Sequence, residues 1–318
     1  MGIRPLPLPV RFLAGESTGS YVTRLATRNG LDVGQLLEQV GEGLSAAEVD
    51  PRYTELYVNR TARDRLAALA GRAVKEMVRA LPSTGDAHLL DDGAGDGPVW
   101  RWPWTPRGGY LVRGCALCAA ARESSDPIWL MCPDPWHICV RHARFHDNSR
   151  NDRAPFVDLT PGPHVVQAER QRMQFVRRLG PLGRALVADA FGVLAHESMG
   201  RARLGARRTT VLQLLPAVMK IADAMAARER SRAVGRLARA EHEQWLRDVY
   251  GKFGWRAGRV LEMWSGQHPP LGTVAVTRKR GTHLPLSAPH QRVDAMQSVD
   301  ELTCVPWSVL AMVERPYG

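Results

Sequence analysis

Four residues with metal-binding side chains stand in two short pairs. The segment "CALC" contains Cys115 and Cys118, and "CVRH", after a gap of twenty residues, contains Cys139 and His142. Two tight turns could each present one pair, giving a tetrahedral shell of three thiolates and one imidazole that suits Zn²⁺. Because all four positions are filled, none is left for a reactive water. The spacing therefore predicts one structural zinc ion, not a catalytic metal.

Other ligand sets remain open at this stage. Cys132 and His146 are the nearest substitutes, and His137 is the third. Cys304 stands apart from these residues, so we expect it to be a small core residue.

An enzymatic alternative uses the same segment. His137, His142, His146 and Asn148 are loosely similar to the His-Asn-His layout of ββα-metal nucleases. Such a site needs a catalytic histidine free of the zinc and an open second metal position. Here His142 is required as a ligand, and no acidic cluster accompanies His146. We find no phosphate-binding loop and no metalloprotease motif, so we expect no enzyme.

The N-terminus and the apolar runs favour an intracellular protein. "MGIRPLPLPVRF" contains two arginines and three prolines where a signal peptide needs an unbroken apolar stretch. No apolar run approaches the ~20 residues of a membrane span, and the longest, 185–195, contains Asp189. We expect a cytoplasmic protein without membrane contact, whose reducing surroundings favour metal binding over disulfides.

The positive charge is concentrated in one part of the chain. The 318 residues carry a net charge of +11. Residues 163–260 contain 19 Lys and Arg against 8 Asp and Glu, whereas 1–110, 111–162 and 261–318 each balance to zero. Such a concentration predicts a surface that binds a polyanion, most simply nucleic acid. The alternative is a set of solvated helices rich in arginine.

The arginines of this stretch form two clusters along the sequence. We expect nucleic-acid contacts from the first cluster, Arg207 and Arg208 above all. Arg201 and Arg203 belong to it as well, and the second cluster comprises Arg228, Arg230, Arg232, Arg236 and Arg239.

Helical patterns dominate the chain, so we expect a mainly α fold. Residues 1–110 form an N-terminal helical domain, 111–147 a small zinc-binding module, 163–262 a basic helical domain of about four segments, and 263–318 an irregular C-terminal tail. Residues 82–110, rich in Gly, Pro and Asp, have the composition of a linker or long loop. In the basic domain, Pro216 should start or kink its helix.

One helical pair has the spacing of a helix-turn-helix. In "LAALAGRAVKEMVRALP" an apolar stripe that includes Leu66 is broken at Gly71 and resumes through Met77. A small residue before the glycine and an apolar plug after it are typical of this motif, although any helical hairpin with Gly in its turn can look similar. The second helix would present three basic residues to DNA: Arg72, Lys75 and Arg79.

Two separate parts of the chain resemble the TniQ family. The first is "PLPVRFLAGESTGSYVTRLATRNG", where a proline-rich start leads to Glu-Ser, a helix with an aromatic residue, and Arg-Leu-Ala. The second is "CALC…WLMCPDPWHICVRH", where Trp129 precedes the second ligand pair. The helix-turn-helix segment lies between them, as the family order requires. The resemblance covers about residues 5–147.

This resemblance implies a target-selection protein of transposition systems. Such proteins recognise target DNA, or a guide complex on it, and recruit an AAA+ ATPase and a transposase. By position, Cys115, Cys118, Cys139 and His142 match the family's zinc ligands, and 62–80 its helix-turn-helix. Glu16, Ser17 and Arg24 match its opening motif, whose expected role is structural.

The expected function is therefore a non-catalytic, nucleoid-associated adaptor. Its expected partners are DNA or a nucleoprotein target complex, an AAA+ ATPase and transposase subunits, and a homodimer is left open. Many family members follow the second ligand pair with another C-P-x-C, whereas this chain continues "FHDNSRND", which argues against a multi-finger DNA reader. A stand-alone zinc-stabilised transcriptional regulator is the alternative, and the metal nuclease is third.

Overall fold

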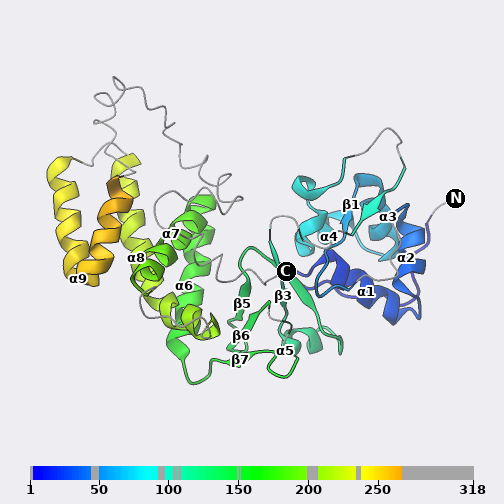
Figure 1. Cartoon of the computed structure of the whole chain (residues 1–318). Helices are drawn as coiled ribbons and strands as arrows, with labels where there is room; N and C mark the ends of the chain where they lie inside the picture. Colours follow the sequence, from blue (N-terminus) through cyan, green and yellow to red (C-terminus); the bar gives the residue numbers. More distant parts are fainter. Residues whose placement is uncertain are drawn as a thin grey trace. The chain divides into compact units, whose positions relative to one another are not determined.

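The computed structural model forms two compact units, Met1–Pro161 (unit 1) and Gly162–Gly318 (unit 2) (Figure 1). The described residues are 3–43, 50–91, 97–102, 106, 109–148, 150, 152–198, 207–233 and 238–266, without the side chains of 195–198 and 207–210. As expected, the described chain is mainly helical. Its small sheets all lie in unit 1. The tail, including Cys304, falls outside the described residues beyond Gly266.

The first two helices begin and end at local sequence signals. Helix α1 (Thr18–Arg28) starts after Ser17, whose Oγ accepts a hydrogen bond of 3.0 Å from the Ser20 N–H. It ends at Asn29 and Gly30, where a φ of 67° favours glycine. Helix α2 (Val33–Val40) ends at Gly41. The apolar faces of both helices are buried in the core of unit 1.

Two short helices follow at the predicted helix-turn-helix segment. Helix α3 (Arg60–Leu69) is capped by Asn59, whose Oδ1 accepts from the Ala62 N–H at 2.9 Å. Gly71 has a φ of 61° in the turn, and helix α4 (Val74–Ala80) begins three residues later. Leu66 and Met77 are both fully buried, so the helix pair is fixed to the same core as α1 and α2.

Residues 82–110, expected to be a linker or long loop, contain short regular elements that join the core. After two 3₁₀ turns (Pro82–Thr84 and Asp86–His88), strand β2 (Trp100–Arg101) pairs with β1 (Tyr57–Val58). The Trp100 side chain is buried, and its Nε1–H donates to the Gly41 carbonyl at 3.0 Å. Burial of this indole outweighs the local turn composition and draws the segment into the core.

The regular elements of the cysteine segment are mostly short antiparallel strands. Strand β3 (Tyr110–Arg113) pairs with β4 (Trp129–Cys132), and helix α5 (Ala116–Ala120) lies between them in the chain. A second, three-stranded sheet has the order β5-β6-β7, formed by Trp136–Cys139, Arg144–Asp147 and Val157–Asp158.

The N-terminal motif and the cysteine segment are joined by backbone hydrogen bonds. The Ser17 N–H donates to the Trp129 carbonyl at 2.8 Å, and the Met131 N–H donates to the Gly15 carbonyl at 2.8 Å. Gly15–Ser17 therefore runs antiparallel to β4 and extends its small sheet. The first helix and the metal-ligand segment belong to one folded body.

Unit 2 contains the four helical segments expected from the sequence: α6 (Pro163–Leu179), α7 (Pro181–Ser198), α8 (Arg207–Ala233) and α9 (Arg239–Gly266). Helix α7 packs against the other three, and residues 185–190 on it are all buried. Helix α8 begins nine residues before Pro216 and continues through it, so the expected helix start at this proline is wrong. Helix α9 is kinked at Gly254, where φ is 82°.

None of the described helices combines the length and the apolar character that a membrane span requires.

Candidate metal centre and nucleic-acid interface

The four predicted ligands converge on one point of unit 1. Cys115 is the N-terminal cap of α5 and Cys118 lies inside that short helix. Cys139 ends β5, and His142 lies in the turn from β5 to β6. The His142 N–H donates to the Cys139 carbonyl at 3.3 Å, which keeps this turn closed. A helix start and a hairpin turn thus each present one pair of ligands.

The distances between the four ligand atoms fit a tetrahedral metal site. His142 Nδ1 lies 3.4, 3.3 and 3.5 Å from the Sγ atoms of Cys115, Cys118 and Cys139. The Sγ atoms of Cys118 and Cys139 are 3.6 Å apart, and all four ligand atoms lie within 4.8 Å of one another. A tetrahedron with Zn–S of ~2.3 Å and Zn–N of ~2.0 Å has edges of about 3.5–3.8 Å. The group could therefore bind one metal ion of this size.

The electrostatics of the cluster also favour a cation. Burial, together with the neighbouring sulfurs of Cys139 and Cys115, raises the pKa of the Cys118 thiol to about 12. Three thiolates cannot share so small a space unless a positive charge lies among them. Metal ligation supplies that charge and releases the thiol protons.

The substitute ligands lie outside this group. Among the described residues, the cluster contains none of Cys132, His137 and His146. Cys132 is the last residue of β4, opposite Tyr110 in the sheet. His137 and His146 face each other across the β5–β6 pair.

His146 is buried as a neutral side chain. Its Nδ1 lies 3.1 Å from the Pro155 carbonyl oxygen, so this nitrogen carries the proton and donates it. Burial lowers the pKa of His146 to about 4, against the opposing effect of this hydrogen bond. A nuclease of the kind considered above needs an accessible basic histidine, and His146 is only 2% exposed. This position therefore does not favour the nuclease alternative.

The basic residues expected on the helix-turn-helix are exposed. Arg72 lies in the turn, Lys75 near the start of α4 and Arg79 in its last turn. Lys75 and Arg79 are four residues apart and share one face of the helix. Met77, on the opposite face, is buried in the core. The structure thus places these three cations at the surface on a rigid support, and Glu76 lies beside them.

The arginines of unit 2 divide into exposed and buried groups. Arg228 and Arg232, two members of the second cluster, are buried. Glu229 pairs with both, at 3.0 Å to Arg228 and 2.8 Å to Arg232. The Arg228 guanidinium also lies within 5.6 Å of the ring centres of Trp245 and Trp264. Arg228 thus links α8 to α9, Arg232 pairs within its own helix, and neither buried side chain is available to DNA.

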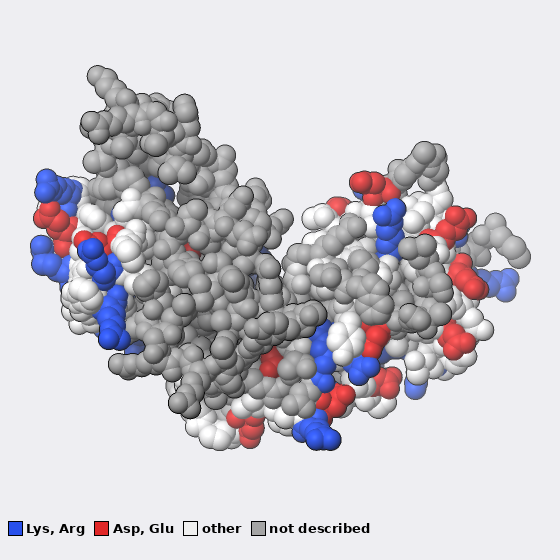
Figure 2. All heavy atoms as spheres, in the orientation of Figure 1, with Lys and Arg blue, Asp and Glu red and all other residues white. Residues whose placement is uncertain are grey.

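The remaining arginines of the two clusters have varied surroundings. Arg230 and Arg239 are exposed, and Arg239 pairs with Glu243 on its own helix at 2.9 Å. Arg207 and Arg208 open helix α8, but their side chains are not described, and Arg201, Arg203 and Arg236 fall outside the described residues. On the face shown in Figure 2, Lys and Arg side chains lie over α9 together with acidic ones.

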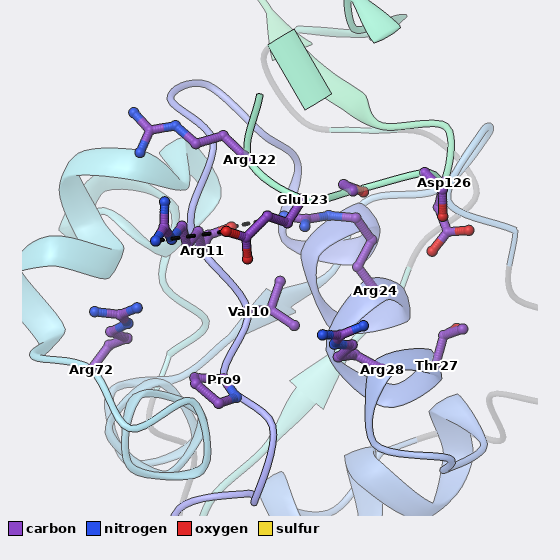
Figure 3. Close-up of a pocket in the computed structure, with 12 residues that line it drawn as sticks. Pro9, Val10, Arg11, Arg24, Thr27, Arg28, Arg72, Arg122, Glu123 and Asp126 are labelled. Atoms are coloured by element: carbon purple, nitrogen blue, oxygen red, sulfur yellow. Dashed lines mark hydrogen bonds and ion pairs between the residues drawn. The ribbon is translucent and has the colours of Figure 1, made fainter. Parts of the chain in front are cut away.

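Sequence reasoning missed a pocket of about 510 Å³ in unit 1 (Figure 3). Arg72 lines it, as expected for an exposed residue, but so do Arg11, Arg28 and Arg122, which no motif singled out. These residues come from four separate segments of the chain. No local pattern could have brought them together.

The comparisons with known proteins agree with the N-terminal motifs. Residues 7–145 match the family model described as TniQ. This match contains α1 to α5, the proposed metal ligands and the helix-turn-helix segment. No curated protein and no solved structure matches the chain.

Proposed function

With residues 7–145 forming a TniQ domain, we propose that the protein is a non-catalytic adaptor that selects the target site in transposition. A TniQ domain indicates an adaptor role associated with transposition and DNA. In the proposed role the chain contacts DNA or a nucleoprotein target complex, and recruits an AAA+ ATPase and through it the transposase.

One observation carries this proposal: the α3–α4 pair is anchored in the core by its apolar residues and exposes its basic residues. Leu66 and Met77 fix the two helices to the core, whereas Lys75 and Arg79 project from one exposed face. Basic side chains on a rigid helix contact phosphates, or base edges when the helix enters the major groove.

Zinc has a structural role in this proposal. Cys115, Cys118, Cys139 and His142 would hold the ion, and it would lock helix α5 to the β5–β6 hairpin. The ligand spacing of 3.3–3.6 Å supports this ion. A closed shell of three thiolates and one imidazole is typical of folding sites and leaves no position for substrate. Arg207 and Arg208, at the start of α8, remain proposed DNA contacts.

DNA binding by the full-length, zinc-loaded chain tests the proposal. The variant Lys75→Gln/Arg79→Gln removes two exposed cations from α4, and Arg60→Gln/Arg101→Gln removes two exposed cations elsewhere in unit 1. If each residue of the α4 pair contacts one phosphate, the slope of log K against log salt should fall by about 2 in the first variant. The control variant should keep the slope of the parent protein.

Two results would contradict this function. Equal DNA affinity in both variants would assign α4 to packing or to a protein partner. A protected site of defined sequence at a promoter, formed without any partner protein, would favour the stand-alone regulator. The adaptor role further requires that an AAA+ ATPase binds DNA that carries this chain more strongly than it binds DNA alone.

A further inference from the structure

The pocket of unit 1 is surrounded by arginines from four segments. The extended segment Pro9–Arg11 forms one wall, and helix α1 contributes Arg24 and Arg28. Arg72 reaches it from the α3–α4 turn, and Arg122 comes from the end of the α5 region. In Figure 3, Pro9 and Val10 lie between Arg72 and Arg28. Its volume of about 510 Å³ is in the range of ligand sites.

Most of these cations have no internal counter-ion. Among the described residues, no carboxylate lies within ion-pair distance of Arg28, Arg72 or Arg122. Arg11 meets Glu123 at 3.8 Å, and both side chains are more than half exposed, so this pair is weak. Asp126 is the other acidic residue of the lining. The lining therefore has an excess of positive charge.

The wall that carries Arg11 is held rigidly. Arg24 Nη2 donates to the Arg11 carbonyl at 3.1 Å, and the same guanidinium is fixed by Glu16. Asn29 makes a reciprocal pair of hydrogen bonds with the backbone of Leu8, both of 2.9 Å. The segment is thus clamped on either side of Pro9 and Val10. A preorganised backbone of this kind lowers the ordering cost of binding a ligand against it.

The geometry points to a backbone phosphate of a nucleic-acid strand as the ligand; this inference rests on the function proposed above. Guanidinium groups approach from several directions, which suits the tetrahedral oxygens of phosphate better than a planar carboxylate. The hydroxyl-bearing residues Thr27 and Ser125 also line the pocket and can donate to such oxygens. Arg72 joins the pocket to the turn that precedes α4. A strand lying on α4 would therefore pass a phosphate into the pocket.

The test uses the full-length, zinc-loaded chain and a duplex DNA of mixed sequence. The pocket variant Arg28→Gln/Arg122→Gln removes two exposed lining cations and leaves Arg72 and α4 unchanged. The control Arg60→Gln/Arg101→Gln and the α4 variant Lys75→Gln/Arg79→Gln carry the same charge change. We expect the pocket variant to bind about tenfold more weakly at low salt, with a salt slope smaller by about 1. The control should bind as the parent does.

The outcomes separate this inference from the proposed function. A pocket variant that binds like the control, while the α4 variant is weakened, overturns the pocket and leaves the function standing. If the pocket variant binds DNA more weakly and the α4 variant binds as the parent does, the pocket is supported and α4 is not a DNA contact. Absence of DNA binding by the parent protein overturns both.

A second measurement identifies the source of the phosphate. Thermal unfolding of the parent and the pocket variant is compared in inorganic phosphate and in chloride of equal ionic strength. If phosphate stabilises only the parent while the two proteins bind DNA equally, the pocket is a free-anion site and the nucleic-acid assignment is overturned. If DNA binding differs as expected, the strand phosphate is supported.

Discussion

Arg24 and Glu16 form a buried, two-pronged ion pair at the start of the TniQ domain. Arg24 Nε donates to Glu16 Oε1 at 2.8 Å, and Nη2 donates to Oε2 at 2.6 Å. Neither side chain is more than 6% exposed. Glu16 Oε1 also accepts from the Ser20 hydroxyl at 3.0 Å. The pair joins the segment before α1 to the middle of that helix, which explains why the opening motif carries both residues.

Removing one partner of the Glu16–Arg24 ion pair should destabilise the protein. Arg24→Met leaves the Glu16 carboxylate buried without its cation, so we expect α1 to lose about 3–5 kcal/mol of stability. Amide hydrogen exchange of α1 measures this loss of stability. The double variant Glu16→Gln/Arg24→Met should recover part of the loss, because no isolated charge remains. Arg239→Met, which breaks an exposed pair, should change stability by less than about 0.5 kcal/mol. An Arg24→Met protein as stable as its parent would contradict this assignment.

The turn between α3 and α4 depends on a glycine. Gly71 has a φ of 61°, a region that residues with a Cβ adopt at a cost. Gly71→Ala should therefore destabilise the helix pair by about 1 kcal/mol. Gly34→Ala is the matched control, because Gly34 lies in α2 with open space around its Cα. It should stabilise by up to about 1 kcal/mol. Urea unfolding of both variants gives the comparison, and equal effects would refute the argument.

Zinc content distinguishes ligands from other cysteines. Cys139→Ser should bind less than one equivalent of zinc, because it removes one of the four ligands. Cys132→Ser, which changes a cysteine outside the cluster, should retain the full equivalent. Metal analysis after gel filtration measures both. A full equivalent in Cys139→Ser would reject the ligand set.

Removal of zinc from the parent protein should unfold the β3–β6 region. Structural zinc contributes about 10–16 kcal/mol in small finger peptides, compared with about 5–15 kcal/mol for the stability of a whole domain. Hydrogen exchange of these strands after chelation checks this, and unchanged protection would contradict it.

Stability should depend on pH through Glu55. Burial raises the pKa of this carboxyl to about 7, against hydrogen bonds from the Thr18 N–H and from nearby hydroxyls. In the unfolded chain its pKa is near 4.5. Between these values the folded protein binds the extra proton, so the Glu55 contribution to stability falls as pH rises from about 4.5 to 7.

The variant Glu55→Gln isolates this effect, because a neutral amide resembles the protonated carboxyl. Relative to the parent protein it should gain stability across that window, by about 3 kcal/mol at its upper end. The opposite dependence of His146, whose lowered pKa favours the folded state as pH rises from about 4 to 6.5, is common to both proteins and cancels. Urea unfolding at several pH values measures the difference. A constant difference would show that Glu55 is ionised throughout.

Substitution of two neighbouring arginines of α8 should affect stability to very different extents. Arg228 is 2% exposed and its Nη2 donates to the Ser265 carbonyl at 3.0 Å, whereas Arg230 is exposed. Arg228→Met should destabilise unit 2 by about 3 kcal/mol, since Glu229 loses one of its two cations. Arg230→Met should leave stability within about 0.5 kcal/mol. Hydrogen exchange of α8 measures the stability of both variants, and similar effects would place Arg228 at the surface.

The sequence predicted the elements whose signals are local. The type and spacing of the four Cys and His residues predicted their cluster. Ser17 and Asn29-Gly30, where α1 begins and ends, are local signals of the same kind. Gly71 marks the turn between α3 and α4 for the same reason: each signal lies within a few residues of the feature it determines.

The features that could not be predicted from the sequence depend on tertiary packing. Strands such as β4 are four residues long and apolar throughout, so they show no alternation that could identify them. Arginine is seldom buried, and the charge pattern of α8 does not reveal that Arg228 faces Trp245 and Trp264. Trp100 lies in a stretch with turn composition, yet its burial determines the path of that stretch.

The pairing of Gly15–Ser17 with β4 has a consequence for synthesis of the chain on the ribosome. The Trp129 N–H donates to the Ser20 hydroxyl, a residue 109 positions earlier. At elongation rates of ~5–20 residues per second, the N-terminal segment waits roughly 5–20 s before its partner strand is translated. During this interval Leu13, which belongs to the same core cluster as Leu130 of β4, lacks part of its cover. The segment that leads into α1 is therefore completed only after nearly the whole domain has been translated. Chaperone contact with the nascent TniQ domain should therefore persist until β4 has left the exit tunnel.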